Sequence, residues 1–218
     1  QVVKIRLMEL IDAIRQRRSV KHFDAEHRLT EDELRHLLGH AFLAPSSFNM
    51  QNWHVVAVDD QAQQDALCEA SWHQGQVKDC SVTLILGGSI TGYKKVARFT
   101  RKAPEKVQEM FAGFVNGLYD GNEQLQRDEA VRSIGLLAQN IMLIAKDMGL
   151  DSCPMIGYDA AKVAEIVGLP ADCPPLMMIT VGKGVKAAQA RMGLFDFEEL
   201  VSHNSFGKKG LCGEIDDK

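Results

Sequence analysis

The feature that most constrains this chain is one long apolar helical pattern beyond its midpoint. From Asp128 to Met148, apolar residues recur every three to four positions. The stripe comprises Val131, Ile134, Leu137, Ala138, Ile141, Leu143, Ile144, Ala145 and Met148. A helix this apolar is buried on most sides, and Gly149 is expected to end it. One small domain offers little surface to cover it, which favours the core of a dimer, although a monomer core also fits.

The remaining pattern predicts many helices and few strands. Thr30 and Glu33 have the spacing of a capping box, so a helix begins there and stops before Pro45. Further helices are expected at residues 5–16, 61–70, 159–167 and 195–201, and strands at 54–58, 82–86 and 176–181. The sequence therefore predicts an α+β domain around one modest sheet. No linker divides residues 1–218, which indicates a single domain with a helical excursion at about 90–127.

Composition excludes several classes of protein. With 218 residues, 45% hydrophobic and 25% charged, the chain resembles an average globular protein. Its net charge of -4 argues against general attraction to nucleic acid or an anionic membrane. No apolar run approaches the roughly 20 residues of a membrane span. Five cysteines without CxxC spacing indicate free thiols in a reducing compartment, so a cytoplasmic location is expected.

Common catalytic motifs are absent. The glycines of Gly87–Gly92 follow a predicted strand, but Tyr93 stands where a phosphate-binding P-loop requires lysine. No GxGxxG opens a helix, and no GxSxG is present. His36 and His40 are spaced to share a helix face, but the glutamate of a zinc-protease motif is missing. We therefore expect no metal site, and Cys153 is better explained as a packed side chain than as a nucleophile.

A basic cluster follows the first predicted helix. Residues 1–28 hold seven Lys/Arg against four Asp/Glu, and Arg15, Arg17, Arg18 and Lys21 lie close together around Ser19. One interpretation is that these cations complement the negative end of the helix dipole. The alternative is a phosphate site, since guanidinium groups and a hydroxyl suit phosphate oxygens. A second polar segment, Ala44 to Trp53, offers Ser, Asn and Gln side chains able to bind a heteroaromatic edge or a polyol.

Taken together, these segments resemble the FMN-dependent nitroreductase family. The likeness rests on Arg17 to Asp24 (RRSVKHFD) and Pro45 to Trp53 (PSSFNMQNW), with later support from Pro154 to Asp159 and from Val181-Gly182-Lys183 followed by Arg191. It covers about residues 8–200. The resemblance implies a nitroreductase-like α+β fold with a central, mostly antiparallel sheet, flanking helices and the long helix at a dimer core. It also implies a homodimer with FMN at the subunit interface.

The resemblance further implies roles for individual residues. Lys21 would lie at the N1/O2 edge of the flavin and tune it electrostatically, because reduced flavin carries negative charge there. No other catalytic side chain is implied. The implied cofactor-binding set also includes Arg17, Ser19 and Arg191 at the phosphate, with Arg18 beside them. It further includes Pro45, Ser46, Ser47, Asn49 and Gln51 from the loop donated largely by the partner, His73 and Gln76 at the pyrimidine edge, and Pro154, Met155, Ile156 and Gly157 near N5.

The sequence departs from the common family pattern at four places. Ile156 replaces a glutamate beside the flavin, Asn52 replaces a proline, and Gln189 replaces a basic residue. His73 and Gln76 stand where asparagine and lysine are common. The excursion at 90–127 resembles the helices that cover the flavin in this family. Phe99, Phe111 and Phe114 are therefore interpreted as the substrate pocket, with ordinary core packing as the alternative.

The resemblance implies an FMN-dependent oxidoreductase. Electrons would pass from NADH or NADPH to nitroaromatic, quinone or similar planar acceptors by a ping-pong mechanism. The alternative is a flavin-binding, flavin-processing or dehalogenating family member that does not use nicotinamide for turnover. A third hypothesis is a structural dimer without flavin.

Overall fold

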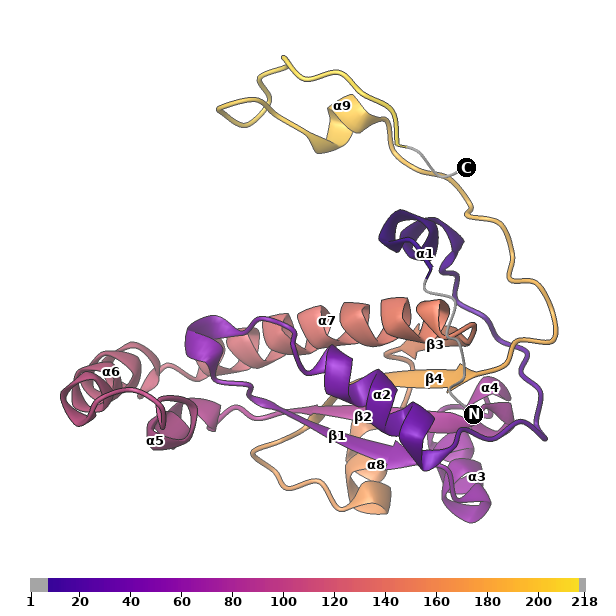
Figure 1. Cartoon of the computed structure of the whole chain (residues 1–218), viewed down its shortest axis with the longest axis horizontal. Helices are drawn as coiled ribbons and strands as arrows, with labels where there is room; N and C mark the ends of the chain where they lie inside the picture. The colour runs from indigo at the N-terminus through magenta and orange to yellow at the C-terminus, as the bar shows by residue number, and fades with distance from the viewer. Residues whose placement is uncertain (1–7, 216–218) are drawn as a thin grey trace.

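The computed structural model describes residues 8–215, and its architecture is α+β (Figure 1). Four strands form one sheet in the order β1-β2-β4-β3, and every neighbouring pair is antiparallel. These are β1 (Trp53–Val58), β2 (Val82–Gly88), β3 (Asp151–Met155) and β4 (Pro175–Gly182). The predicted fold class, with a mostly antiparallel sheet flanked by helices, is confirmed.

Most of the predicted helices are present. The helical elements are α1 (Leu10–Gln16), α2 (Glu31–Ala41), η1 (Ser47–Asn49), α3 (Gln61–Ala70), α4 (Gln76–Asp79), η2 (Gly92–Lys95), α5 (Val96–Phe99), α6 (Glu105–Tyr119), α7 (Glu123–Asp147), α8 (Ala160–Val167) and α9 (Phe197–Leu200). The capping box at Thr30 and Glu33 is formed. The expected helix at 5–16 begins at Leu10, and residues 5–7 of that prediction lie outside the described residues.

The sheet lies between two layers of helices, and the alternation of side chains along the strands explains this arrangement. Leu84 and Leu86 of β2 face a core shared with α2 and α7, whereas Ile85 between them faces a second core shared with α3 and α8. In β4, Ile179 and Met178 divide in the same way. Because both faces are covered, β2 is buried along its whole length. Figure 1 shows α7 on one side of the sheet and α3 and α8 on the other.

The long apolar helix predicted from the sequence is α7. It starts five residues before the predicted Asp128, because the Asn122 side chain accepts a hydrogen bond from Leu125 N and caps the helix there. Gly149 ends it at φ +76°, a conformation that favours glycine. Most of the predicted stripe is buried, but Val131 faces outward and is 44% exposed. The prediction that Val131 is buried is therefore wrong within the single chain.

Strand β3 is not predicted from the sequence. Pro154 and the short length of Asp151–Met155 hide it, since proline cannot donate a hydrogen bond to a neighbouring strand. The structure accommodates Pro154 because β3 is the edge strand beside β4. On its open side, Val20 N donates to Ser152 O at 3.0 Å, which ties the basic segment to the sheet.

The excursion at 90–127 forms η2, α5, α6 and the start of α7, and has its own small core. Tyr93, Val115 and Tyr119 are buried there with Met50 of the preceding loop. After β4 the chain leaves the sheet, and residues up to α9 stand away from the body (Figure 1). Across residues 8–215, no helix combines the length and apolar character needed to cross a membrane.

Candidate functional site

The predicted phosphate residues line one cavity. Arg17, Arg18, Ser19 and Lys21 lie between α1 and α2, and Arg191 comes from the segment after β4. Together with Lys186 and Gln189 they surround a hollow of about 420 Å³. Segments about 170 residues apart in the chain thus meet beside β3. Gln189 carries no charge, but Lys186 lines the same cavity and supplies a positive charge there.

The cavity concentrates positive charge. Burial, and then repulsion from Arg191 and Arg18, lowers the pKa of the Arg17 guanidinium. Within residues 8–215, none of Arg17, Lys21 and Arg191 forms an ion pair with a carboxylate. Converging guanidinium groups, an ammonium and a hydroxyl are the donor set that a phosphate monoester needs. The residues present therefore fit the phosphate group of FMN.

The basic segment runs alongside the buried thiol of Cys153. Burial raises the pKa of Cys153, while the nearby charges of Lys21 and Arg17 act to lower it. Cys153 is 4% exposed, so its sulfur is a packed core group. This agrees with the interpretation that Cys153 is not a nucleophile. The effect of Lys21 on Cys153 also indicates that Lys21 lies beside β3. The C-terminal end of β3 leads to Gly157, in the segment that the resemblance assigns to N5 of the flavin.

A tight turn after α3 contacts that backbone. The Gln74 side chain donates from Nε2 to Gly157 O at 2.9 Å, and Gln76 Nε2 donates to Gln74 Oε1 at 3.0 Å. Gln76 is buried and also lies 3.6 Å from the sulfur of Met155. His73 points outward in the left-handed region, and Ile156 is exposed. The turn and the 154–157 segment are therefore joined by side-chain hydrogen bonds.

A Cβ at Gly157 would force a neighbouring side chain to move. Built there, it would lie 2.9 Å from Trp72 Cζ3 and 3.3 Å from Gln74 Nε2. Neither Trp72 nor Gln74 was predicted as a site residue. The sequence offers no signal for them, since they matter only through the path of the turn. Glycine at this position lets the turn approach the peptide groups that the resemblance assigns to the flavin ring.

The loop Pro45–Gln51 lies elsewhere in the same chain. Figure 1 shows it near α6, at the opposite end of the molecule from the Arg17–Lys21 segment. Its backbone is unusual, because Phe48, Asn49 and Gln51 all have φ near +50°. Such conformations are uncommon for residues other than glycine and concentrate at functional sites. A single chain therefore does not bring Pro45, Ser46, Ser47, Asn49 and Gln51 to the basic cavity.

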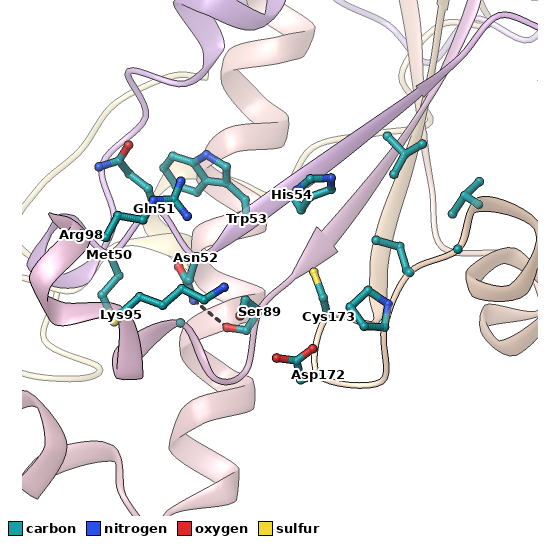
Figure 2. Close-up of a pocket in the computed structure, with 16 residues that line it drawn as sticks. Met50, Gln51, Asn52, Trp53, His54, Ser89, Lys95, Arg98, Asp172 and Cys173 are labelled. Atoms are coloured by element: carbon teal, nitrogen blue, oxygen red, sulfur yellow. Dashed lines mark hydrogen bonds between the residues drawn. The ribbon is translucent and has the colours of Figure 1, made fainter.

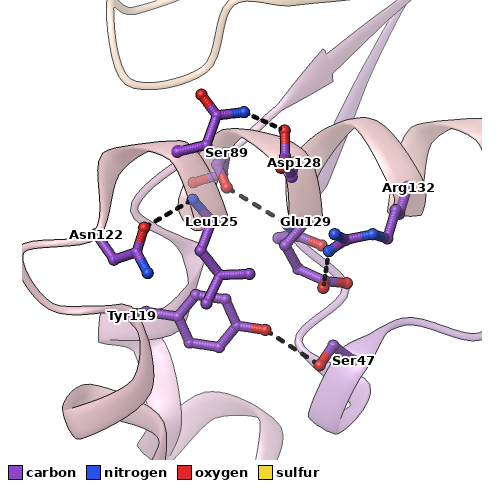
Figure 3. Close-up of polar contacts among 10 residues, drawn as sticks. Ser47, Ser89, Tyr119, Asn122, Leu125, Asp128, Glu129 and Arg132 are labelled. Atoms are coloured by element: carbon purple, nitrogen blue, oxygen red, sulfur yellow. Dashed lines mark hydrogen bonds and ion pairs between the residues drawn. The ribbon is translucent and has the colours of Figure 1, made fainter.

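A side chain at the end of α6 holds this loop. The Tyr119 hydroxyl donates to Ser47 Oγ at 3.1 Å, and an Arg132–Glu129 ion pair of 3.0 Å lies beside it (Figure 3). Gln51 N donates to Ser46 Oγ at 2.9 Å, which closes the loop on itself. Tyr119 is the last residue of α6. Its contact with Ser47 shows that the helical excursion supports the loop.

The three predicted pocket aromatics gather at this loop rather than at the basic cavity. The Phe48 ring contacts those of Phe111 and Phe114 edge-on, with centroids 6.2 and 5.7 Å apart. Phe99 and Phe111 are half-buried in the small core, which matches the core-packing alternative. Phe114 is exposed, so it alone of the three presents most of its ring outward.

A second cavity, of about 270 Å³, lies between the start of β1, the segment after β2 and the turn before β4. Figure 2 shows Gln51, Lys95 and Arg98 on one side and Asp172 and Cys173 toward the other. Asn52 lines it and donates weakly from Nδ2 to Ser89 O at 3.5 Å, while its Oδ1 has no partner. It shares no lining residue with the basic cavity. Within the described residues, no cluster of His, Cys, Asp or Glu is arranged to hold a metal ion.

Comparison with known proteins agrees with this geometry. A family model described as "Nitroreductase family" matches residues 14–183. Protein DrgA of a Synechocystis species is 45% identical over 185 residues, covering 84% of this chain and 88% of DrgA. MhqN of Bacillus subtilis, named provisionally as an NAD(P)H nitroreductase, is 33% identical over 184 residues, covering 81% and 89%.

A solved structure is similar over nearly its full length. It is a protein of Exiguobacterium sibiricum, assigned provisionally as a nitroreductase and crystallised in complex with FMN. The two chains are 25% identical, with a TM-score of 0.83 and coverage of 90% of this chain and 98% of the other.

Proposed function

The chain belongs to the nitroreductase family, and we propose that it is an FMN-dependent oxidoreductase acting between NADH or NADPH and nitroaromatic, quinone or similar planar acceptors. The observation that carries the proposal is the basic cavity, where Arg17, Arg18, Ser19, Lys21 and Arg191 converge. Among the described residues, Arg17, Lys21 and Arg191 have no carboxylate partner. The FMN bound to a relative of similar fold supports the choice of cofactor.

In this proposal the cavity anchors the phosphate of FMN. Each charge-assisted hydrogen bond to the phosphate contributes about 1.5–3 kcal/mol, so a few such bonds hold the cofactor without covalent attachment. The rest of FMN would lie along β3. Val20 N donates to Ser152 O, which places the basic segment beside this strand, and the strand leads toward Gly157. His73, Gln76 and the Pro154–Gly157 backbone then border the ring.

Bound FMN would supply the redox chemistry, taking up a hydride from the nicotinamide and passing electrons to the acceptor. Lys21 holds a fixed positive charge against the ring edge where negative charge develops, which eases reduction. Main-chain N–H groups of Met155 to Gly157 orient the ring. Donor and acceptor occupy one pocket in turn, so the kinetics are ping-pong.

A second copy of the chain completes the site. The loop Pro45–Gln51 has the strained backbone of a binding loop but lies far from its own basic cavity. Apolar side chains also remain exposed on α1 and α7, including Leu10, Ile11 and Leu136. Burying these faces in a homodimer stabilises it by the hydrophobic effect. Ser46, Ser47 and Asn49 of one subunit then reach the FMN of the other, with Phe114 beside the acceptor.

Colour and bleaching test the proposal. The purified protein should be yellow with flavin absorbance, and anaerobic NADH or NADPH should bleach it. Lys21→Met should slow the bleaching more than it weakens FMN binding, because Lys21 is assigned to the ring edge. Protein that stays yellow with both donors favours a flavin-binding or flavin-processing role. Colourless protein that takes up no FMN contradicts the proposal.

A further inference from the structure

The turn that follows α3 holds a tryptophan in a strained and exposed position. Trp72 and His73 have φ of +55° and +59°, in the left-handed region. For a bulky residue this conformation is a strained outlier. Trp72 is nevertheless 67% exposed, so burial of the indole does not offset the strain.

Surrounding contacts hold the turn in this form. His73 N donates to Cys68 O at 2.9 Å, and Gln74 Nε2 donates to Gly157 O at 2.9 Å. Buried Gln76 supports Gln74 from behind through a 3.0 Å hydrogen bond. Strain that is fixed by so many neighbours is typical of binding and active sites. Its effect here is to place the indole edge against Gly157.

The exposed indole has an exposed apolar neighbour. Ile156, the residue before Gly157, is 79% exposed. Large apolar side chains grouped at the surface mark a binding surface, and tryptophan offers a rigid aromatic face for stacking. These residues flank the peptide groups assigned above to the flavin ring, so a ligand stacked on Trp72 would lie at the edge of that ring.

We propose that Trp72 is a specificity-determining residue that stacks with planar aromatic acceptors, such as quinones, beside the Ile156–Gly157 backbone. The inference rests on the proposed flavin site and adds a residue that the resemblance does not supply. It assigns acceptor selection to the chain whose basic cavity holds the flavin. Phe114 lies beside the loop Pro45–Gln51, so in the proposed dimer it belongs to the part of the site that the partner contributes.

Binding of menadione, a flat naphthoquinone, to the oxidised holoprotein tests this. Without NADH or NADPH no turnover occurs, so equilibrium dialysis gives the dissociation constant. Trp72→Ala should weaken menadione binding by about 2- to 12-fold, the usual range for an aromatic pair. Trp72→Phe should restore most of the affinity. Phe206→Ala, at an exposed aromatic of the C-terminal segment, is the matched control and should leave binding unchanged.

Turnover gives a second readout. For Trp72→Ala, kcat/KM should fall for menadione but not for ferricyanide, which has no aromatic ring to stack. Unchanged menadione binding in a yellow Trp72→Ala protein overturns the inference. It is equally overturned if Trp72→Ala releases FMN or changes the oligomeric state, because Trp72 would then serve the cofactor or the interface. Failure of the proposed function is distinct, since the unsubstituted protein would then bind no FMN or would stay yellow with both NADH and NADPH.

Discussion

At the scale of single residues, the site depends on charge that the chain leaves unbalanced. Arg17 and Arg191 repel each other, and repulsion together with burial lowers the pKa of Arg17. Such a cluster destabilises the protein by itself and is relieved when an anion binds. The net charge of -4 conceals this local excess. Only a ligand that carries negative charge relieves this repulsion, which is why we assign the cavity to the phosphate of FMN.

Removing one guanidinium should therefore weaken FMN binding through the phosphate alone. Arg17→Ala should raise the dissociation constant of FMN by about 10- to 150-fold, since a hydrogen bond to a charged group contributes about 1.5–3 kcal/mol. Riboflavin, which lacks the phosphate, should bind the variant and the unsubstituted protein alike. Fluorescence titration of the apoprotein with each flavin measures both. Equal losses for FMN and riboflavin would place Arg17 away from the phosphate.

At the scale of elements, the helical excursion supports the loop Pro45–Gln51. α6 ends in Tyr119, whose hydroxyl donates to Ser47, and α7 adds the Glu129–Arg132 pair beside it. The left-handed residues of the loop need such neighbours to persist. The aromatic cluster around Phe48 packs the loop against α6 from the other side. Loop and excursion therefore act as one unit within the chain.

Loss of the Tyr119 hydroxyl should affect both stability and the cofactor. Tyr119→Phe removes one hydrogen bond, so the free energy of unfolding should fall by about 0.5–1.5 kcal/mol and FMN should bind more weakly. Thr30→Ala is the matched control, because loss of the α2 cap costs about 1 kcal/mol without touching the loop. Denaturant unfolding and FMN titration give the two quantities. If both variants lose equal FMN affinity, Tyr119 acts only through stability.

Sequence reasoning succeeded for elements with strong local patterns and failed where distant contacts decide. The apolar periodicity of α7 and the capping box of α2 depend only on residues near one another in the sequence, so both helices could be predicted from it. Pro154 concealed β3, because an edge position in the sheet cannot be recognised without knowing its neighbours. Trp72 was missed for the same reason, since its turn depends on hydrogen bonds to Gly157 and Cys68. Most site residues came from the family resemblance rather than from the patterns.

At the scale of the whole molecule, one chain keeps apart two groups of residues that we propose to form a flavin site together. The first group, with Arg17 and Arg191, lines the basic cavity. The loop Pro45–Gln51 of the second group lies at the opposite end of the molecule from the Arg17–Lys21 segment (Figure 1). In a symmetric dimer, the first group of each subunit meets the second group of the other, which gives two equal sites. The long helix α7 suits this arrangement, because Val131 and Leu136 remain exposed for a partner to cover.

Complementation between two defective chains tests this shared site. One chain carries Arg17→Ala and Arg191→Ala, and the other carries Ser46→Ala and Asn49→Ala. Each alone should form dimers that bind FMN poorly. When the two chains are co-expressed with different affinity tags and the mixed dimer is isolated, one site combines the two unaltered groups. We predict one tightly bound FMN per mixed dimer, whereas a mixed dimer binding no better than its parents would contradict the account.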